Sequence, residues 1–168
     1  VATFFGSIVG DNGLSPGLQT NWPAPIGGFE VFFAHSRDAD LGRTFKPRID
    51  ARLSQAQRIA RAQARHALRP GIDGSLLTSD GDLAHLEISA EWEIVDPLLY
   101  AHLIADNFGE EIVTLALENA AVHVVGQITL ENLLDKPLEE LRALIRIDAQ
   151  DSLNAFQSGI RISEVILP

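Results

Sequence analysis

Two groups of carboxylates are the residues of this chain whose type and spacing could support acid–base chemistry. Asp80 and Asp82 flank a single glycine, and Glu87, Glu91 and Glu93 line an alternating apolar stretch. General acid–base catalysis needs a carboxyl group in an altered environment inside a cleft, and an open row of glutamates offers no such contrast. Asp-Gly sequences between strands are typical of hairpin turns. We therefore predict a turn and a solvated acidic strand face, with a carboxylate-based hydrolase as the alternative.

Other catalytic and ligand-binding patterns are absent from the sequence. The chain has no cysteine, which excludes thiol catalysis and cysteine-based zinc sites. A catalytic zinc site needs about three protein ligands, and the five histidines show no such spacing, since His102 and Asp106 make only a pair. No nucleophile elbow, phosphate-binding glycine loop or dinucleotide fingerprint occurs. We predict no metal, no cofactor and no enzymatic activity.

Four arginines recur at spacings of three, four and four residues, which places them on one face of a helix. They are Arg58, Arg61, Arg65 and Arg69. The surrounding stretch, 50–68, is rich in Ala, Gln and Arg and predicts a helix that Pro70 and Gly71 end. Three interpretations stay open: a solvated helix face, contact with an acidic surface of this chain or another subunit, and contact with anionic lipid headgroups.

The net charge of −10 is unevenly distributed along the chain. Residues 37–69 contain nine Lys or Arg and three Asp, a local net charge of +6. The remainder has four basic and twenty acidic side chains, a net charge of −16. Phosphate binding depends on charge neutralisation, so we expect no nucleic-acid partner. The acidic body and the basic segment instead suggest a head-to-tail contact between subunits, of the kind that closes into rings.

Hydrophobic periodicity predicts an α+β fold in which an antiparallel, β-rich first half precedes an α/β second half. The predicted strands are 3–9, 29–34, 75–79, 85–94 and 160–167. Residues 36–73 break the β pattern and are predicted to form a basic helical insert. Clustered prolines and glycines predict an ordered loop over 14–28 that carries apolar side chains. We divide the chain at 96/97, into subdomains 1–96 and 97–168 that share a core.

The second half shows helical signals. Asp96 is the expected N-cap of a helix that begins at Pro97, Thr129 caps a short turn, and Gly159 is the expected C-cap of the last helix. Between them we expect helices over 110–125 and from Pro137 onward. The predicted core stripe of helix 110–125 is Ile112, Leu115, Ala116, Val122 and Val125. That of the helix from Pro137 is Leu141, Leu144, Ile145, Ala149, Leu153 and Phe156.

Apolar residues make up 46% of the 168 residues, a globular composition, and no apolar run reaches the roughly 20 residues that a membrane span needs. The first residue is Val1 and methionine is absent. We therefore expect this sequence to be a piece of a longer chain whose ends carry a membrane anchor.

Six motifs in order resemble the SPFH (band 7) domain of the stomatin–prohibitin–flotillin–HflK/HflC superfamily, most closely its HflK branch. They are Phe5-Gly6-x-Ile8, Leu14-x-Pro16-Gly17-Leu18, Trp22-Pro23-x-Pro25-Ile26, Leu77-Thr78-x-Asp80-Gly81, Trp92-x-Ile94-x-Asp96-Pro97 and Gly159-Ile160-x-Ile162. The resemblance covers most of the chain outside 36–73. It implies that 1–96 is SPFH1-like and 97–168 is SPFH2-like.

The resemblance also implies a function. SPFH proteins are membrane-anchored scaffolds that assemble, with themselves or a homologous subunit, into rings or cages enclosing a membrane patch. HflK/HflC members surround and regulate the membrane AAA protease FtsH. An HflK-like topology would put this domain in the periplasm. The loop nearest the lipid would contain Pro16, Gly17, Leu18, Trp22, Pro23 and Ile26. A stomatin-type, lipid-organising scaffold without a protease partner is the alternative.

Overall fold

A computed structural model describes residues 1–5, 7–10, 14, 18–32, 35–41, 44–45, 54, 56–57, 74–103 and 108–168. The fold is α+β, with antiparallel sheets, as the periodicity predicts. The candidate helix 50–68 and the stripe Arg58, Arg61, Arg65 and Arg69 lie outside the described residues, apart from Ser54, Ala56 and Gln57.

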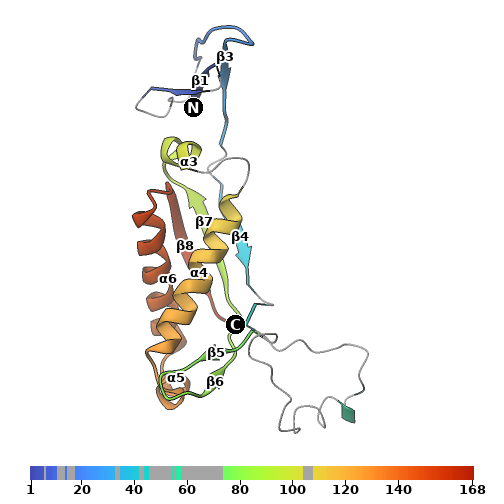
Figure 1. Cartoon of the computed structure of the whole chain (residues 1–168), viewed down its shortest axis with the longest axis vertical. Coiled ribbons are helices and arrows are strands. Elements are labelled where there is room, and N and C mark those ends of the chain that lie inside the picture. The colour runs from blue at the N-terminus through green and yellow to red at the C-terminus, as the bar shows by residue number, and fades with distance from the viewer. Residues whose placement is uncertain are drawn as a thin grey trace.

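The centre of the molecule is a three-stranded antiparallel sheet in the order β4-β7-β8 (Figure 1). It consists of β4 (Arg37–Asp40), β7 (Ser89–Ile94) and β8 (Ile160–Ile166). Helices α4 (Gly109–Gly126) and α6 (Leu138–Ala155) pack on one face of the sheet, α4 against β4 and α6 against β8. Strands from both predicted subdomains therefore share one sheet and one core.

Strand β7 supplies the middle of that core because its side chains alternate between the two faces. Ile88, Ala90, Trp92 and Ile94 are buried, as predicted, while Ser89, Glu91 and Glu93 face the other way and are partly exposed. Trp92, the largest buried side chain, packs against α4 at Gly109, where a Cβ atom would lie 3.0 Å from the indole. The apolar face of β7 thus fixes where α4 begins.

The helices of the second half begin where the sequence predicts. The Asp96 carboxylate accepts hydrogen bonds from the backbone N–H groups of Leu98 and Leu99, at 3.0 and 3.1 Å, at the start of α3 (Pro97–Leu103). Thr129 caps α5 (Leu130–Asp135) by accepting from Asn132 N–H. Helix α6 begins one residue after Pro137.

The predicted end of α6 is wrong. The helix stops at Ala155, and Gln157, with a φ of 52°, occupies the left-handed position that we assigned to Gly159. Ser158 N–H donates to Leu153 O, and Gln157 N–H to Asn154 O, which together close a Schellman motif. Gly159 also has a positive φ, of +69°, but it lies beyond the helix end. A side chain is excluded there because a Cβ atom would lie 2.3 Å from Asp96 O. The Gly159 carbonyl accepts hydrogen bonds from the backbone N–H groups of Val95 and Asp96, which connects the segment after α6 to the start of α3.

The predicted core stripes are partly wrong. In α4, Leu115 and Val122 are exposed. In α6, Leu144 is exposed, and so is Phe156, which follows the end of the helix. The buried residues of α4 are Gly109, Val113, Ala116, Leu117, Ala120, Ala121, Val124 and Val125, and those of α6 are Leu141, Ile145, Ala149 and Leu153. Apolar side chains occur nearly all round α4, so periodicity alone does not single out the buried face.

Three predicted β elements also need correction. The strand predicted over 3–9 is a hairpin of β1 (Ala2–Phe4) and β2 (Ser7–Val9), with Phe4 opposite Ser7 and Phe5 in the turn at a φ of 47°. The strand predicted over 29–34 is β3 (Gly27–Phe29), which pairs with β1. The predicted insert 36–73 begins with β4, a short edge strand that pairs with β7. Its charged sequence, Arg37 to Asp40, did not indicate a strand.

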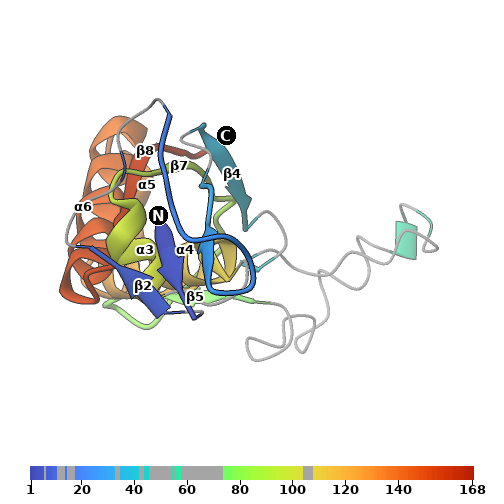
Figure 2. The same cartoon turned by 90° about the horizontal axis from the view of Figure 1, so that it is seen from above.

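Two smaller sheets complete the fold. Sheet β2-β1-β3 lies beyond α3 at one end of the molecule, and its strands pack chiefly against each other (Figure 1). Viewed from that end, β1 and β2 lie in front of α3 and α4 (Figure 2). At the other end, the hairpin of β5 (Leu76–Leu77) and β6 (Leu83–Ala84) packs against α4.

Candidate interaction surfaces

The small sheet β2-β1-β3 carries an exposed apolar surface, which we call the apolar end. Its members share a large hydrophobic side chain and high exposure; they are Phe4, Phe5, Val9, Leu14, Leu18, Trp22, Phe29 and Val31. Soluble proteins rarely leave so many neighbouring apolar side chains exposed, and such patches mark contact with a membrane or another protein. The sheet has no helix packed on it within the described residues that would bury them.

The loop before β3 is held to the hairpin by backbone and side-chain hydrogen bonds. Asn21 Nδ2 donates to Thr3 O at 3.2 Å and to Gly28 O at 2.8 Å, and Phe5 N–H donates to Ile26 O at 2.7 Å. Because Asn21 is fixed in this way, the neighbouring Trp22 points outward and is 64% exposed. The apolar side chains therefore project from an ordered loop, as the sequence predicts.

The predicted membrane-proximal residues are partly described. Leu18, at 97% exposure, and Trp22 are the most prominent, Pro23 is exposed and Ile26 is half-buried. Pro16 and Gly17 lie outside the described residues. An open groove of about 520 Å³ lies beside them, lined by Ala2, Phe4, Val9, Thr20, Asn21, Trp22 and Pro23.

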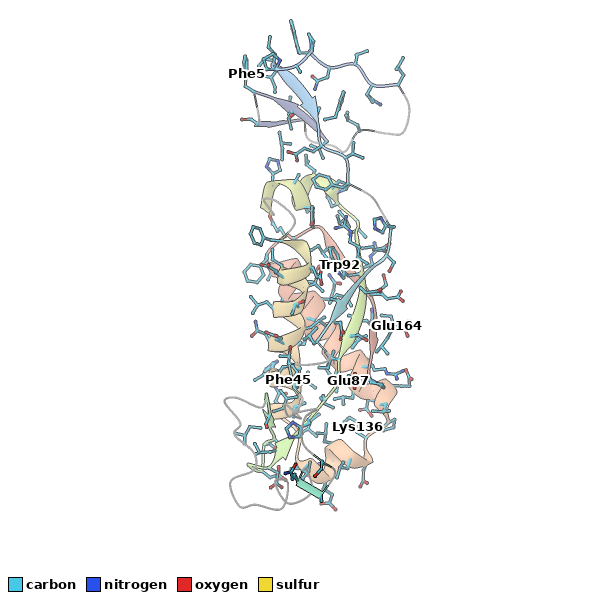
Figure 3. All side chains as sticks on the ribbon, turned by 90° about the vertical axis from the view of Figure 1, so that its right-hand side faces the viewer. Phe5, Phe45, Glu87, Trp92, Lys136 and Glu164 are labelled. Carbon is cyan, nitrogen blue, oxygen red and sulfur yellow. The ribbon has the colours of Figure 1, made fainter. Side chains whose placement is uncertain are left out.

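Sequence reasoning missed the hairpin tip formed by Phe4 and Phe5. Their rings stack edge to face with centroids 4.9 Å apart, and Phe5 is 70% exposed at a positive φ that costs a non-glycine residue conformational energy. The tip lies at the end of the molecule opposite Lys136 (Figure 3). The sequence signal was Phe5-Gly6, which fits a two-residue turn but was assigned to the middle of a strand.

A second surface is the face of the central sheet that points away from α4 and α6; we call it the acidic face. Strand alternation and register place Asp38, Asp40, Glu91, Glu93, Arg161 and Glu164 on it. Glu87 precedes β7 and is partly buried. No helix packs on this face in the part of the chain that the structure describes. Glu91 and Glu93 lie on this face and are partly exposed, as the alternation predicts.

The carboxylate pair Asp80 and Asp82 is not brought to a cleft. Asp80 lies in the turn between β5 and β6, as predicted, where its carboxylate accepts the Thr78 hydroxyl at 2.6 Å and Leu130 N–H at 3.2 Å. The Thr78 hydrogen bond is the main cause that lowers the pKa of Asp80 below its usual range, and the Leu130 N–H lowers it further. An ionised carboxylate fixed by such donors holds the turn against α5.

Within the described ranges, the histidines do not converge with the acids on a metal site. Among the described residues, no three His, Cys, Asp or Glu side chains could hold an ion together. His123 Nδ1 lies 2.9 Å from Asp148 Oδ1, which links α4 to α6, and Gln127 bonds its other nitrogen at 2.7 Å. His102 is exposed on α3, and Asp106 lies outside the described residues.

Comparison of the sequence with known protein families, and with characterised proteins, finds no match. None of the helices in the described ranges is both long enough and apolar enough to cross a membrane.

Proposed function

We propose that this chain is a non-enzymatic, SPFH-type scaffold domain that assembles into rings or cages at a membrane and regulates a membrane AAA protease of the FtsH type. The proposal starts from the six ordered motifs, which run from Phe5 to Ile162. The α+β architecture, with a β-rich start and a helix–helix–strand end, is compatible with it.

The observation that carries the membrane assignment is the apolar end. The rest of the chain is strongly acidic apart from the basic segment, and anionic headgroups repel acidic surfaces. The exposed aromatic and aliphatic side chains around Phe5, Leu18 and Trp22 are therefore the part suited to enter the interfacial region of a bilayer. Aromatic rings are favoured at that depth.

Vesicle flotation tests this assignment. Transfer of one large apolar side chain from water contributes about 1.5–3 kcal/mol, and 1.4 kcal/mol is a tenfold change in an equilibrium constant. The double variant Leu18→Asp, Trp22→Asp should therefore bind neutral phosphatidylcholine vesicles at least tenfold more weakly than the unmodified chain.

The matched control is Leu134→Asp, Leu138→Asp, which adds the same two charges at exposed leucines on either side of Lys136, at the end of the molecule opposite Phe5 (Figure 3). This control should bind like the unmodified chain. Equal binding by the double variant and the control, or no binding by any form, would remove the membrane assignment.

The protease assignment rests on the HflK-like motifs alone and needs its own experiment. Purification of the full parent protein in mild detergent, with particle imaging and mass spectrometry of co-purifying proteins, should yield a ring that carries an AAA protease. A ring without a protease would instead favour the lipid-organising scaffold. A parent protein that stays monomeric in detergent would contradict both.

A further inference from the structure

We propose that the acidic face of the central sheet is the docking surface for a second copy of this chain, which contributes its basic segment, residues 43–69. This inference rests on the proposed assembly and names the contact that would build it. It is independent of the apolar end, because the two surfaces lie on different sheets.

The first argument is the charge pattern of the acidic face. Register places Asp38 opposite Glu91, and Glu91 opposite Glu164, so that three carboxylates cross the sheet in one row. Like charges directly opposite each other on neighbouring strands are destabilising. Glu93 extends the negative charge along β7 (Figure 3 shows Glu164 on the neighbouring strand). Within the described residues no cation is paired with Asp38, Glu91 or Glu164, and a cationic partner would relieve this repulsion.

The described cations nearest the sheet do not neutralise that row. Arg161 is on the acidic face, but it pairs with Glu93 at 3.5 Å. Arg37 belongs to the opposite face, where its guanidinium lies 5.2 Å from the centroid of the Trp92 ring. Glu91 has a hydrogen bond from the Ser36 hydroxyl at 3.3 Å, which supplies no charge. The face therefore keeps a net negative charge within the described residues.

A second observation limits how a partner can approach. The edge strand β8 is closed by side chains of α6: Gln150 bonds both Ile160 O and Ile162 N–H, at 3.0 and 2.8 Å. Arg142 donates to Leu167 O at 2.6 Å. These bonds occupy backbone groups that an added strand would need. The sheet is thus protected against extension along its β8 edge, and β4 forms its other edge.

The basic segment fits the acidic face in charge. Residues 43–69 contain eight Lys or Arg and one Asp, whereas only four basic residues follow position 69 in the whole chain. Two of those four, Lys136 and Arg142, are paired with Glu140 and Glu139. The segment is therefore the concentration of positive charge that the sequence offers to such a face.

The segment also fits in length. If the predicted helix 50–68 continues to Arg69, its arginine stripe spans about 16 Å at 1.5 Å per residue. Strand β7, which carries Glu91 and Glu93, spans about 17 Å at 3.4 Å per residue. The stripe can therefore lie along one strand of the acidic face.

The attachment of the segment allows it to reach a neighbour. Phe45 is buried, and the His85 ring bonds its carbonyl at 3.3 Å. Gly74, with a φ of +65°, lies so close to Thr44 that a Cβ would be 1.7 Å from Thr44 O. Thr44 and Phe45, at the start of the segment, therefore lie beside Gly74, which follows it. The 28 residues between Phe45 and Gly74 thus leave the described fold and return to it at one place.

A heterologous contact of this kind joins two different surfaces. The basic segment of each copy binds the acidic face of the next copy, and such contacts form a ring when the rotation closes. The test is charge-reversal complementation with the 168-residue chain, read by analytical ultracentrifugation at about 0.1 M salt. The face variant carries Glu91→Lys and Glu164→Lys, and the segment variant carries Arg58→Glu, Arg61→Glu and Arg65→Glu.

We expect the unmodified chain to self-associate, each variant alone to associate at least tenfold more weakly, and an equal mixture of the two variants to associate again. Raising the salt to about 1 M shortens the Debye length from about 10 Å to about 3 Å and should dissociate every form. The control Glu111→Lys, Asp151→Lys makes the same charge change as the face variant, at exposed positions of α4 and α6, and should associate like the unmodified chain.

The outcomes separate the docking proposal from the proposed function. Variants that associate normally, an unmodified chain that is monomeric at every concentration, or association that is insensitive to salt would overturn the docking proposal. A mixture that fails to restore association would also overturn it, because the segment would then contact its own chain. None of these results would change the vesicle-binding prediction for the apolar end.

Discussion

The carboxylate of Asp80 accepts a hydrogen bond from the backbone N–H of Leu130, fifty residues further along the chain. Leu130 is the first residue of α5, so this carboxylate satisfies a backbone donor that the helix itself leaves unpaired. The Thr78 hydroxyl fixes the same carboxylate from the other side. A residue that could have been a catalytic acid therefore joins the β5–β6 turn to the start of α5.

The lowered pKa of Asp80 makes a prediction about pH. A carboxyl group whose pKa is lower in the folded state than in the unfolded state stabilises the fold at pH values above its unfolded-state pKa. That contribution is lost as the pH falls from about the ordinary value of 3.8 through the lowered pKa. Asp80→Asn should therefore lower the urea midpoint at pH 7, and its difference from the unmodified chain should shrink at pH 3.

Asp82→Asn is the matched control, because within the described residues the turn uses the backbone carbonyl of Asp82 rather than its carboxylate. Its urea midpoint should follow the unmodified chain at both pH values. Equal effects of the two substitutions would contradict the assignment of Asp80 as the residue that holds the turn.

The two tryptophans predict a resolved fluorescence signal. Trp92 is 1% exposed in the core and Trp22 is 64% exposed at the apolar end. Acrylamide should quench the emission of Trp22 strongly and that of Trp92 weakly, so that Trp22→Phe leaves a blue-shifted, poorly quenched spectrum. Vesicles should shift the emission of the unmodified chain to the blue and leave the spectrum of Trp22→Phe unchanged. A vesicle-induced shift that survives in Trp22→Phe would place the contact elsewhere.

Sequence alone predicted the second half of the fold more closely than the first. Helices α4 and α6 are long enough for helical periodicity to show, and Asp96, Thr129 and Pro137 mark starts by local chemistry. Strand β7 was predicted because one of its faces is buried and the other carries glutamates. The subdomain boundary at 96/97 stays a prediction, as does the SPFH assignment.

The first half was harder to predict because its strands, apart from β7, are only two to four residues long. Strand β4 exists because Ala39 packs in the core and its backbone pairs with β7, a long-range contact that a local pattern of Arg and Asp does not reveal. The turn at Phe5 was missed because an aromatic residue at positive φ is uncommon. The apolar loop was found, since clustered prolines and glycines exclude helix and central strand.

Two glycines at positive φ should respond differently to alanine. At Gly159 a Cβ would meet Asp96 O at 2.3 Å and Tyr100 N at 2.9 Å, whereas at Gly81 it would meet nothing within 4 Å. Gly81→Ala should cost only the left-handed backbone strain, about 1–2 kcal/mol. Gly159→Ala should cost more than that in the free energy of unfolding, because the α3–α6 junction must also move apart. Equal losses in urea titrations would mean that the junction yields freely.

The bonds from Gln150 to the edge of β8 give the last prediction. Gln150→Ala leaves Ile160 O and Ile162 N–H without this partner, and each lost hydrogen bond costs about 0.5–1.5 kcal/mol. The free energy of unfolding should therefore fall by about 1–3 kcal/mol. Gln150→Glu keeps an acceptor for Ile162 N–H but loses the donor to Ile160 O, so we expect a smaller loss.

The control is Gln127→Ala, which removes an exposed side-chain contact with His123 and should change stability by less than about 0.5 kcal/mol. Since an open strand edge can pair with another chain, Gln150→Ala should also associate in a way that persists in about 1 M salt, where charged contacts are screened. Salt-resistant association in Gln150→Ala alone would distinguish edge pairing from charged docking on the acidic face. Unchanged stability in Gln150→Ala would show that water replaces the glutamine at that edge at no cost.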